Sequence, residues 1–499
     1  MKKRIGIVRG NNLNKWEMQN FEPLLDRYDV TAYTTNRSQY DINQIKFPVM
    51  QLPCRSQGLS SYMEGLEDHL ADKDLIFTAD ISWLFSAQTI VAKKRHGCKV
   101  VCLEWENIPF NHENNKVVGR IKEIVRGGAD HFIAVTERAK EALILEGVPE
   151  EMIDVIPMGV DLCRFKPDST YTVRDRGALK IGHEDIVVLF IGRMVREKGI
   201  YSIAHAAAKI LGDSSMKDLP IKFLLTGKGA ELDMLVQRTA DLGISDRFIF
   251  PGDYPYDKMH RLHNLADIFI LPSISAITWQ EQFGMVLVES MACGKPVIST
   301  LSGSITEVVG DAGILVQPND HLSLYQALKE LISDKKLREI LGRKALERAI
   351  DKFDSRNTAE KAGKVFEKVL SSITVDGDLK PLYERGIKLW EVGELEKGFK
   401  AVLSSFAEYP DNKEVLDSIV SMGSRLGKND QVETALKEYL KYHPADIDSL
   451  IKLSEILLTM RRLDEAEEEL QKICIFEPLN EKAAALITMV KNEANAMID

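Results

Sequence analysis

The chain has 499 residues, which at roughly 100–200 residues per domain suggests about three domains. Its composition, 44% hydrophobic and 28% charged, is that of an ordinary globular protein and excludes a disordered, collagen-like or disulfide-based scaffold. The net charge of −10 argues against nucleic-acid binding. The segment from Asp376 to the end holds 25 acidic and 16 basic residues, so most of the excess belongs to a separate C-terminal unit.

The cysteines and the hydropathy pattern indicate the cellular compartment of the protein. None of the six cysteines forms a Cys-x-x-Cys pair, which is typical of reduced thiols in the cytosol. No apolar run approaches the ~20 residues that span a bilayer, and the apolar stretch after the basic start ends at Arg9, too early for a secretory signal. We therefore expect a cytoplasmic protein.

Short β-branched runs alternate with amphipathic stretches over residues 1–350, which predicts parallel sheets covered by helices on both faces. The first series comprises Ile5–Val8, Leu75–Phe77, Val100–Leu103, Phe132–Val135 and Val155–Pro157. The second comprises Ile186–Ile191, Phe223–Thr226, Phe248–Phe250, Ile268–Leu271, Val297–Ser299 and Ile314–Val316. Two series predict two Rossmann-like, doubly wound domains, 1–170 and 171–350, with a ligand cleft between them at the carboxyl ends of the strands. We expect residues 351–374 to form a helix that returns towards the first domain.

Residues 375–499 carry only helical patterns. Pro410, Pro444 and Pro478 are spaced by 34 residues, and small or apolar residues recur with the same period at Gly386, Val420 and Ser454. This period is that of tetratricopeptide repeats, in which paired helices approach closely at small residues and proline ends the second helix. The alternative is a generic array of helical hairpins. We expect the repeats to bind a protein partner in a concave groove.

The stretch from Glu281 to Ser299 carries the strongest chemical signal. It reads as a helix over Phe283–Ala292 that ends at Gly294 and is followed by a strand. The free N–H groups at its start form an anion site, strengthened by the helix dipole. Glu289 can accept two hydrogen bonds from a ribose, and Glu281 can do the same for a second polyol. A polyol, a phosphate and another polyol together describe a nucleotide sugar.

Two further strand ends are suited to phosphate. Arg193 and Lys198 follow the strand Ile186–Ile191, and their side chains suit the oxygens of a diphosphate. Gly227 follows the next strand, where a small residue lets a ligand approach the backbone.

These motifs, in this order, resemble the retaining glycosyltransferases of family four (glycosyl transferases group 1), which have the GT-B fold. The segments Val155–Asp161, Ala266–Ser273 and Glu307–Gly313 add to the resemblance, which covers roughly residues 1–370. It implies transfer of a hexose from a nucleotide diphosphate sugar to a hydroxyl on a glycan, a lipid-linked sugar or a protein. It also implies retention of anomeric configuration, and no metal or other cofactor.

The resemblance assigns roles residue by residue. The catalytic set is Arg193 and Lys198 at the donor diphosphate and Glu281 at the donor sugar. Glu289 would bind the ribose, Gly252 would border the base, and the first domain would contribute Gly10 and Asn11 at the diphosphate. The remaining donor-binding residues are Gly192, Gly227, Gln282, Phe283, Gly284 and Met285.

The chain departs from the family pattern in three places. A first-domain histidine that usually contacts the primary hydroxyl of the donor sugar is absent from the matching strand, which leaves Glu104, Trp105, Glu106, Asn107 or no residue for that contact. A donor without that hydroxyl, a 6-deoxy sugar, is therefore an option. The loop Ile274–Gln280 is long and contains Trp279, which suggests a lid or an acceptor platform. Asn12 stands where a second glycine is usual in the first-domain loop.

Other interpretations stay open. One is a repeat-based protein-binding scaffold that carries an inactive transferase fold; another, a dinucleotide oxidoreductase, lacks its glycine fingerprint at Gly227–Leu232. We expect His260 and His263 to be surface residues rather than metal ligands, and Asp446–Asp448 to be a solvated turn. The basic run Lys93–His96 is expected to be a solvated helix end, with weak contact to an anionic membrane as the alternative.

Overall fold

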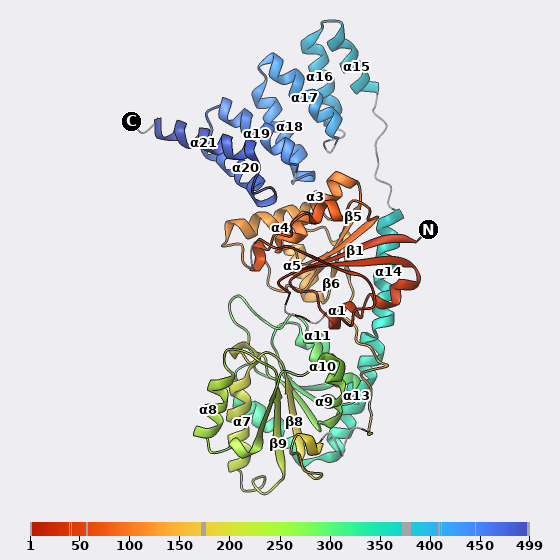
Figure 1. The fold of residues 1–499 in the computed structure, drawn as a ribbon, viewed down its shortest axis with the longest axis vertical. Helices are drawn as coiled ribbons and strands as arrows, with labels where there is room; N and C mark the ends of the chain where they lie inside the picture. Colours follow the sequence, from red (N-terminus) through yellow and green to blue (C-terminus); the bar gives the residue numbers. More distant parts are fainter. Residues whose placement is uncertain are drawn as a thin grey trace.

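The computed structural model describes residues 2–38, 40, 42–55, 58–170, 176–371, 381–407, 410, 412–444 and 446–496. Two α/β domains, each built on one parallel sheet, are followed by an all-helical region (Figure 1). The fold class predicted from the sequence is therefore confirmed.

The first sheet has the strand order β3-β2-β1-β4-β5-β6-β7, with every neighbouring pair parallel. Its strands are β1 (Lys3–Gly10), β2 (Tyr28–Thr35), β3 (Val49–Leu52), β4 (Leu75–Ala79), β5 (Lys99–Glu104), β6 (His131–Ala134) and β7 (Ile153–Val155). The helices used below are α1 (Lys15–Met18), α3 (Leu84–His96), α4 (Lys116–Gly128) and α5 (Glu137–Leu145). Sequence patterns missed β2, which mixes polar and apolar residues, and β3, an edge strand that is buried at only one of its four positions.

The second sheet has the order β10-β9-β8-β11-β12-β13, again all parallel. Its strands are β8 (Ile186–Ile191), β9 (Ile221–Thr226), β10 (Phe248–Gly252), β11 (Ile268–Leu271), β12 (Val297–Thr300) and β13 (Gly313–Val316). The helices are α7 (Ile200–Gly212), α8 (Leu232–Asp241), α9 (Met259–Leu265), α10 (Met285–Ala292), α11 (Ile305–Val309), α12 (His321–Ser333) and α13 (Lys335–Phe353). Strand β8 is buried at five consecutive positions, as expected for a strand covered on both faces.

The strand orders place one ligand-binding crevice in each domain. In the first sheet the order reverses between β1 and β4, and in the second between β8 and β11. Ligands of open parallel sheets bind outside the carboxyl ends of strands at such reversals. The residues after β1 and β4 and those after β8 and β11 line common cavities, so the two crevices face each other.

Helix α14 (Ser355–Ser371) follows α13 and packs against the first domain. Phe366 lies 5.6 Å, ring centroid to centroid, from Phe77 of β4. Thr358 Oγ1 donates a hydrogen bond to Asn20 Oδ1, and Arg27 pairs with Glu367 at the surface. Figure 1 shows α13 and α14 running along one side of both domains.

The C-terminal region consists of helices that pack on their neighbours along the chain. They are α15 (Pro381–Glu391), α16 (Leu395–Phe406), α17 (Lys413–Leu426), α18 (Asn429–Tyr442), α19 (Ile447–Thr459), α20 (Leu463–Phe476) and α21 (Glu481–Ala496). A Cβ added to Gly386 would lie 2.6 Å from Val402 Cγ2, so the close approach of α15 and α16 requires a glycine there.

The helical region docks on the first domain through the basic end of α3 (Figure 1). Lys94 forms an ion pair with Asp446, and Arg95 Nη2 lies 2.8 Å from Glu477 Oε1. Phe476 is 1% exposed and belongs to a hydrophobic cluster otherwise formed by the first domain. The expectations of a solvated turn at Asp446 and a solvated helix end at Lys93–His96 are therefore wrong, because these opposite charges neutralise each other across an interface. Among the described residues, no helix is long and apolar enough to cross a membrane.

Candidate active site

Two adjoining cavities lie between the α/β domains. The first, of about 480 Å³, is lined by residues of both domains, including Lys198, Glu281 and Trp105. The second, of about 910 Å³, is lined by strand ends of the second domain, including Gly192 and Gly227, and by the loop after β1. The two cavities adjoin at the residues that line both of them, which are Arg193 of the second domain and Asn12, Asn14, Trp16 and Tyr40 of the first.

Three glycines stand at neighbouring strand ends beside the larger cavity. Gly192 N–H donates to Thr226 O, and Gly227 N–H donates to Gly252 O. Gly227 has a φ of +133°, and an added Cβ would lie 2.0 Å from Gly192 O. The glycines therefore let successive strand ends pack tightly and leave the backbone open to a ligand. Gly192 and Gly227 line the cavity, whereas Gly252 lies behind it.

Lys198 and Glu281 form the charged centre of the smaller cavity. Lys198 Nζ lies 2.6 Å from Glu281 Oε2, which also accepts a hydrogen bond from Ser273 Oγ at 2.7 Å. The two side chains are only 14% and 8% exposed. Arg193, in contrast, is exposed and has no ion-pair partner among the described residues. Lys198 is therefore held by a carboxylate, whereas Arg193 is open to an anionic ligand.

The predicted anion site lies at the first turn of α10. Gln282, Phe283, Gly284 and Met285 all line the smaller cavity. Gly284 has a φ of +88°, which brings the chain into the helix and leaves the first N–H groups of α10 without intrahelical partners. The Phe283 ring is buried edge-on against Trp105 of the first domain, with ring centroids 6.0 Å apart.

Glu289 occupies a different position from that expected of a ribose ligand. It is 2% exposed and lines neither cavity. The Tyr256 hydroxyl donates to Glu289 Oε1 at 3.0 Å, and His263 Nε2 lies 3.4 Å from Oε2. Burial and the neighbouring Glu289 raise the pKa of Tyr256 well above its usual range, so the phenol keeps its proton. Tyr256 lines the larger cavity and stands between it and Glu289.

His263 was expected at the surface, and the structure corrects this. The side chain is fully buried and faces Glu289. Its ring also lies 5.9 Å from that of Phe165 and 5.5 Å from that of Phe269, centroid to centroid. Among the described residues, no group of three or more His, Cys, Asp or Glu side chains is placed to hold a metal ion.

The first domain contributes its own residues to the cavities. Asn11 lines the larger cavity, but Gly10 lies behind it, where an added Cβ would lie 2.5 Å from the Phe85 ring. Gly10 is therefore explained by packing. Asn12 lines both cavities in the place of the second glycine.

Four residues were candidates to replace the absent histidine at the donor sugar. Two of them line the smaller cavity, and the other two are engaged in contacts elsewhere. Trp105 and Glu106 line the smaller cavity. Glu104 is buried, accepts hydrogen bonds from the N–H groups of Ile81 and Glu106, and has a pKa raised well above its usual range by burial and by Asp80. Asn107 Nδ2 donates hydrogen bonds to Glu281 O at 3.0 Å and to Ser304 Oγ at 2.9 Å, and so links the first domain to the second.

Sequence reasoning missed several residues of the smaller cavity. His112 lines it from the loop between β5 and α4, beyond the strand where the sequence was searched for a histidine. Asp80, Ser82 and Trp83 line it directly after β4. They lie just beyond the carboxyl end of a predicted strand, as Arg193 does in the second domain, and this position is the sequence signal for them.

The loop Ile274–Gln280 links the two domains. Asn111 Nδ2 donates to Thr278 O at 3.1 Å, and Gln280 Nε2 donates to Asn107 O at 3.2 Å. Trp279 lines the smaller cavity, with Lys198 Nζ 5.0 Å from the centre of its indole ring. Whether the loop acts as a lid or as an acceptor platform stays a prediction.

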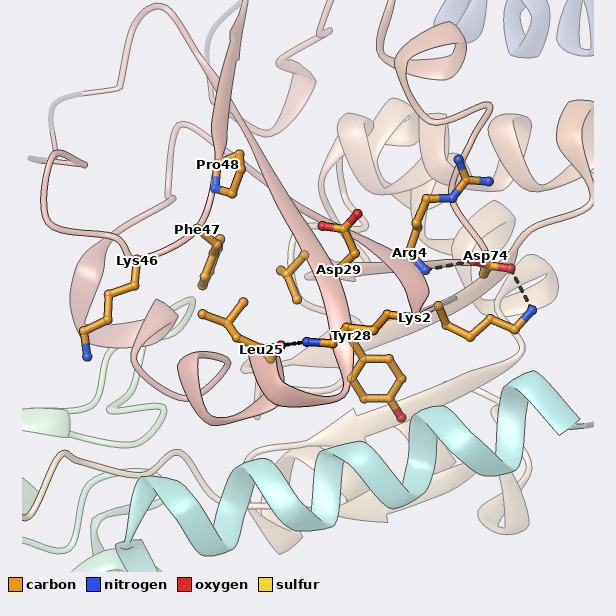
Figure 2. Close-up of a pocket in the computed structure, with 11 residues that line it drawn as sticks. Lys2, Arg4, Leu25, Tyr28, Asp29, Lys46, Phe47, Pro48 and Asp74 are labelled. Carbon is orange, nitrogen blue, oxygen red and sulfur yellow. Dashed lines mark hydrogen bonds and ion pairs between the residues drawn. The ribbon is translucent and has the colours of Figure 1, made fainter.

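A separate hollow of about 700 Å³ lies at the amino ends of β1, β2 and β4 (Figure 2). Its charged groups are largely paired: Lys3 Nζ lies 2.8 Å from Asp74 Oδ1, and Lys2 Nζ donates to Leu25 O. Because ligands of parallel sheets bind at the opposite edge, this hollow is not part of the candidate site.

Two α/β domains with facing crevices and a cationic, glycine-lined cleft define a GT-B type of fold. The family model for glycosyl transferases group 1 matches residues 173–348, and that for glycosyltransferase family 4 matches residues 24–164. The chain therefore belongs to the family-four, group 1 glycosyltransferases.

Named relatives agree with this assignment. The D-inositol 3-phosphate glycosyltransferase of Corynebacterium jeikeium is 30% identical over 297 residues, which are 58% of this chain and 67% of the relative. That of Acidothermus cellulolyticus is 32% identical over 253 residues, or 49% and 54% of the two chains. The chain thus spans about half the length of several curated relatives that it matches.

Solved structures share the fold. Anabaena HepE, crystallised in complex with UDP, matches with a TM-score of 0.63 and 21% identity over 73% of this chain and all of that chain. Sucrose-phosphate synthase from Thermosynechococcus elongatus matches with a TM-score of 0.60 and 20% identity over 74% of this chain and all of that chain. Both matches leave out a quarter of the chain.

Proposed function

We propose that the protein is a retaining glycosyltransferase that transfers a hexose from a nucleotide diphosphate sugar to a hydroxyl acceptor. The observation that carries this proposal is the position of Arg193 where two cavities meet. A nucleoside in the larger cavity and a sugar in the smaller one would place the connecting diphosphate at this guanidinium group. HepE, a structural neighbour, has been crystallised with UDP-glucose, in keeping with such a donor.

The chemistry assigned to these residues is electrostatic. As the bond from the sugar to the diphosphate breaks, negative charge develops on the leaving oxygen. Arg193, Lys198 and the first N–H groups of α10 would stabilise this charge, so the proposed mechanism needs no metal and no other cofactor. Glu281 would hold the donor-sugar hydroxyls, and a leaving phosphate oxygen would take the proton of the acceptor hydroxyl.

Two further roles follow from the placement of side chains. We assign His112 and Glu106 to the hydroxyls of the donor sugar, because both line the smaller cavity with Glu281. This makes a hexose with a primary hydroxyl a better candidate than a 6-deoxy sugar. We keep Glu289 as the ribose ligand, reached when the Tyr256 hydroxyl moves aside or shares the contact.

The test separates the two carboxylates. A nucleoside diphosphate without a sugar should raise the melting temperature of the wild-type protein and of Glu281→Gln, but not that of Glu289→Gln. Turnover of nucleotide sugars, screened over bases and hexoses, should be lost in both variants. A wild-type protein that binds no nucleoside diphosphate would instead support the second candidate, a scaffold with an inactive transferase fold.

The helical region is assigned to partner binding. A hollow of about 660 Å³ on it is lined by Tyr383, Trp390 and Lys413, among others. Deleting residues 376–499 would expose Lys94 and the apolar residues of the first domain that pack against Phe476, so point variants in this hollow are the better test. Tyr383→Ala combined with Trp390→Ala should weaken capture of a protein acceptor or partner and leave turnover on a small acceptor unchanged. We also propose a cytoplasmic location.

A further inference from the structure

Tryptophans are concentrated in the smaller cavity. The chain has five, and four of them, Trp16, Trp83, Trp105 and Trp279, line this one space of about 480 Å³. The fifth, Trp390, lies in the helical region. Three different strand ends of the first domain and one loop of the second supply the four indoles. Trp105 also belongs to the hydrophobic core and Trp16 and Trp83 pack against core clusters, yet each of the four also lines the cavity.

The four indoles have different surroundings. Trp105 is 7% exposed and lies edge-on to Trp16 and to Phe283, so it forms the back of the cavity. Trp16 and Trp83 are only half-buried. One face of Trp83 stacks on Phe85, with ring centroids 5.3 Å apart and planes 23° apart. Its opposite face has no such stacking partner among the described aromatic rings, and exposed aromatic surface of this kind favours contact with apolar groups of a ligand.

Carboxylates stand beside these indoles. Asp80 Oδ1 accepts a hydrogen bond from the backbone N–H of Trp105 at 2.8 Å. Glu106 holds its own loop through the N–H groups of Asn107 and Ile108. A sugar ring presents C–H groups on its faces and hydroxyls around its edge. An indole face can pack against the C–H groups, and a neighbouring carboxylate can accept hydrogen bonds from the hydroxyls.

The charges on the first-domain side of the smaller cavity disfavour an anionic acceptor. The only lysine or arginine of the first domain among the described residues that line the smaller cavity is Arg9. Its guanidinium group is 4% exposed and is bound to Glu17, with Nε 2.7 Å from Oε1, and to Ala79 O at 2.8 Å. Asp80 lies within electrostatic reach of Arg9, but Arg9 is already bound to Glu17, and Glu106 has no lysine or arginine ion-pair partner among the described residues. A phosphorylated acceptor would therefore face carboxylates without a free basic partner, since Arg193 and Lys198 are assigned to the donor.

We propose that the acceptor is an uncharged pyranose, free or at the end of a glycan, whose ring packs on Trp83 and Trp16 while Asp80 accepts its hydroxyls. This inference rests on the proposed transferase function and names its acceptor. It sets this chain apart from the relatives named for D-inositol 3-phosphate.

The test uses tryptophan fluorescence and turnover together. In full-length protein carrying Trp390→Phe, the remaining indoles all report on the cavity. With a saturating nucleoside diphosphate bound, methyl glycosides of glucose, galactose, mannose and N-acetylglucosamine are titrated, with inositol 3-phosphate and glucose 6-phosphate as anionic probes. At least one neutral glycoside should quench the fluorescence. In turnover assays with a nucleotide diphosphate sugar as donor, the same glycoside should accept the sugar, with a KM at least 10-fold below that of either anion.

Substitution of Trp83 locates the contact. Trp83→Ala should raise the KM for the neutral acceptor at least 10-fold, and Trp83→Phe by less, because a phenyl ring keeps part of the stacking surface. The nucleoside diphosphate should stabilise both variants as it does the wild-type protein, which shows that they fold and bind donor. The inference is overturned if only the anionic probes quench the fluorescence or accept the sugar, or if no neutral glycoside quenches the fluorescence or accepts the sugar. It is also overturned if Trp83→Ala leaves the KM for the neutral acceptor unchanged. Failure of the nucleotide itself to bind would overturn the proposed function instead.

Discussion

Lys198 Nζ and Glu281 Oε2 lie 2.6 Å apart, so two residues separated by 83 positions in sequence form one ion pair at the meeting point of the domains. The geometry arises because Lys198 follows β8 and Glu281 follows β11, and these strands are neighbours in the sheet. The carboxylate holds the ammonium group in place before a donor binds. Preorganised charge of this kind stabilises a transition state without a cost of reorganisation at the moment of reaction.

Lys198→Ala should therefore lower kcat at least 100-fold, on the scale of losing one preorganised charged contact. Lys198→Arg keeps the charge but not its compact geometry, and should recover only part of the activity. Steady-state kinetics on the best donor measure both effects. Lys217→Ala, at an exposed lysine far from the cleft, is the matched control and should retain full activity. Full turnover by Lys198→Ala would remove this residue from the catalytic set.

Tyr256→Phe tests the contact between Tyr256 and Glu289. Loss of the hydroxyl leaves one oxygen of a buried carboxylate without its donor, which should cost about 1–3 kcal/mol of unfolding free energy. The same oxygen becomes available to a ribose, so a nucleoside diphosphate should bind more tightly and recover part of the lost stability. Chemical denaturation without the nucleotide measures the loss of unfolding free energy, and denaturation with the nucleotide measures how much of it is recovered. Weaker nucleotide binding would indicate that the Tyr256 hydroxyl itself contacts the ligand.

Asp446 and Lys94 test the docking of the helical region. Burial alone would raise the pKa of Asp446, but Lys94 and Lys413 outweigh it and hold the pKa well below its usual range. Because this pKa is lower in the folded state, the stabilisation is present above about pH 4 and is lost as the pH falls below it. Lys94→Met should cost about 3 kcal/mol, because it leaves a buried carboxylate short of one partner.

The docking can be measured without activity. Small-angle scattering should detect a larger radius of gyration in Lys94→Met and in the wild-type protein below pH 4. The exposed pair Lys482–Glu455 is the control, since Lys482→Ala should change stability by less than about 1 kcal/mol. An unchanged radius in Lys94→Met would show that Phe476 and its apolar neighbours suffice for docking.

Asp80 predicts a pH dependence of stability. Burial raises the pKa of this cavity carboxyl to about 6, against the partial opposition of Arg9. Because the folded pKa exceeds that of the unfolded chain, ionisation costs more in the folded state, and stability falls as the pH rises from about 4 to 6. Asp80→Asn lacks this loss, so its stability relative to wild type should increase by on the order of 2 kcal/mol between pH 4 and pH 7. A difference that stays constant over this range would show that Asp80 ionises normally.

The strand patterns and motifs were sufficient to predict two α/β domains and the cleft between them. The consecutive apolar residues of Ile186–Ile191 predict a strand that is buried on both faces. The residues that follow this strand along the chain must lie at its carboxyl end. Arg193, Lys198 and the Gln282–Met285 turn are therefore local consequences of strand and helix signals, and the structure places all of them on the cavities. The weak pattern of β2 left no comparable signal.

Other properties were decided only by the tertiary structure, because they depend on contacts between segments far apart in sequence. The charge pattern identified an acidic tail, but its pairing with the basic end of α3 depends on how the helices dock. The Glu289 position follows a helix period, yet Tyr256 reaches it from the turn before α9 and His263 from α9 itself. The four tryptophans look scattered along the chain, and only the folding of both domains around one cleft brings them to a single cavity.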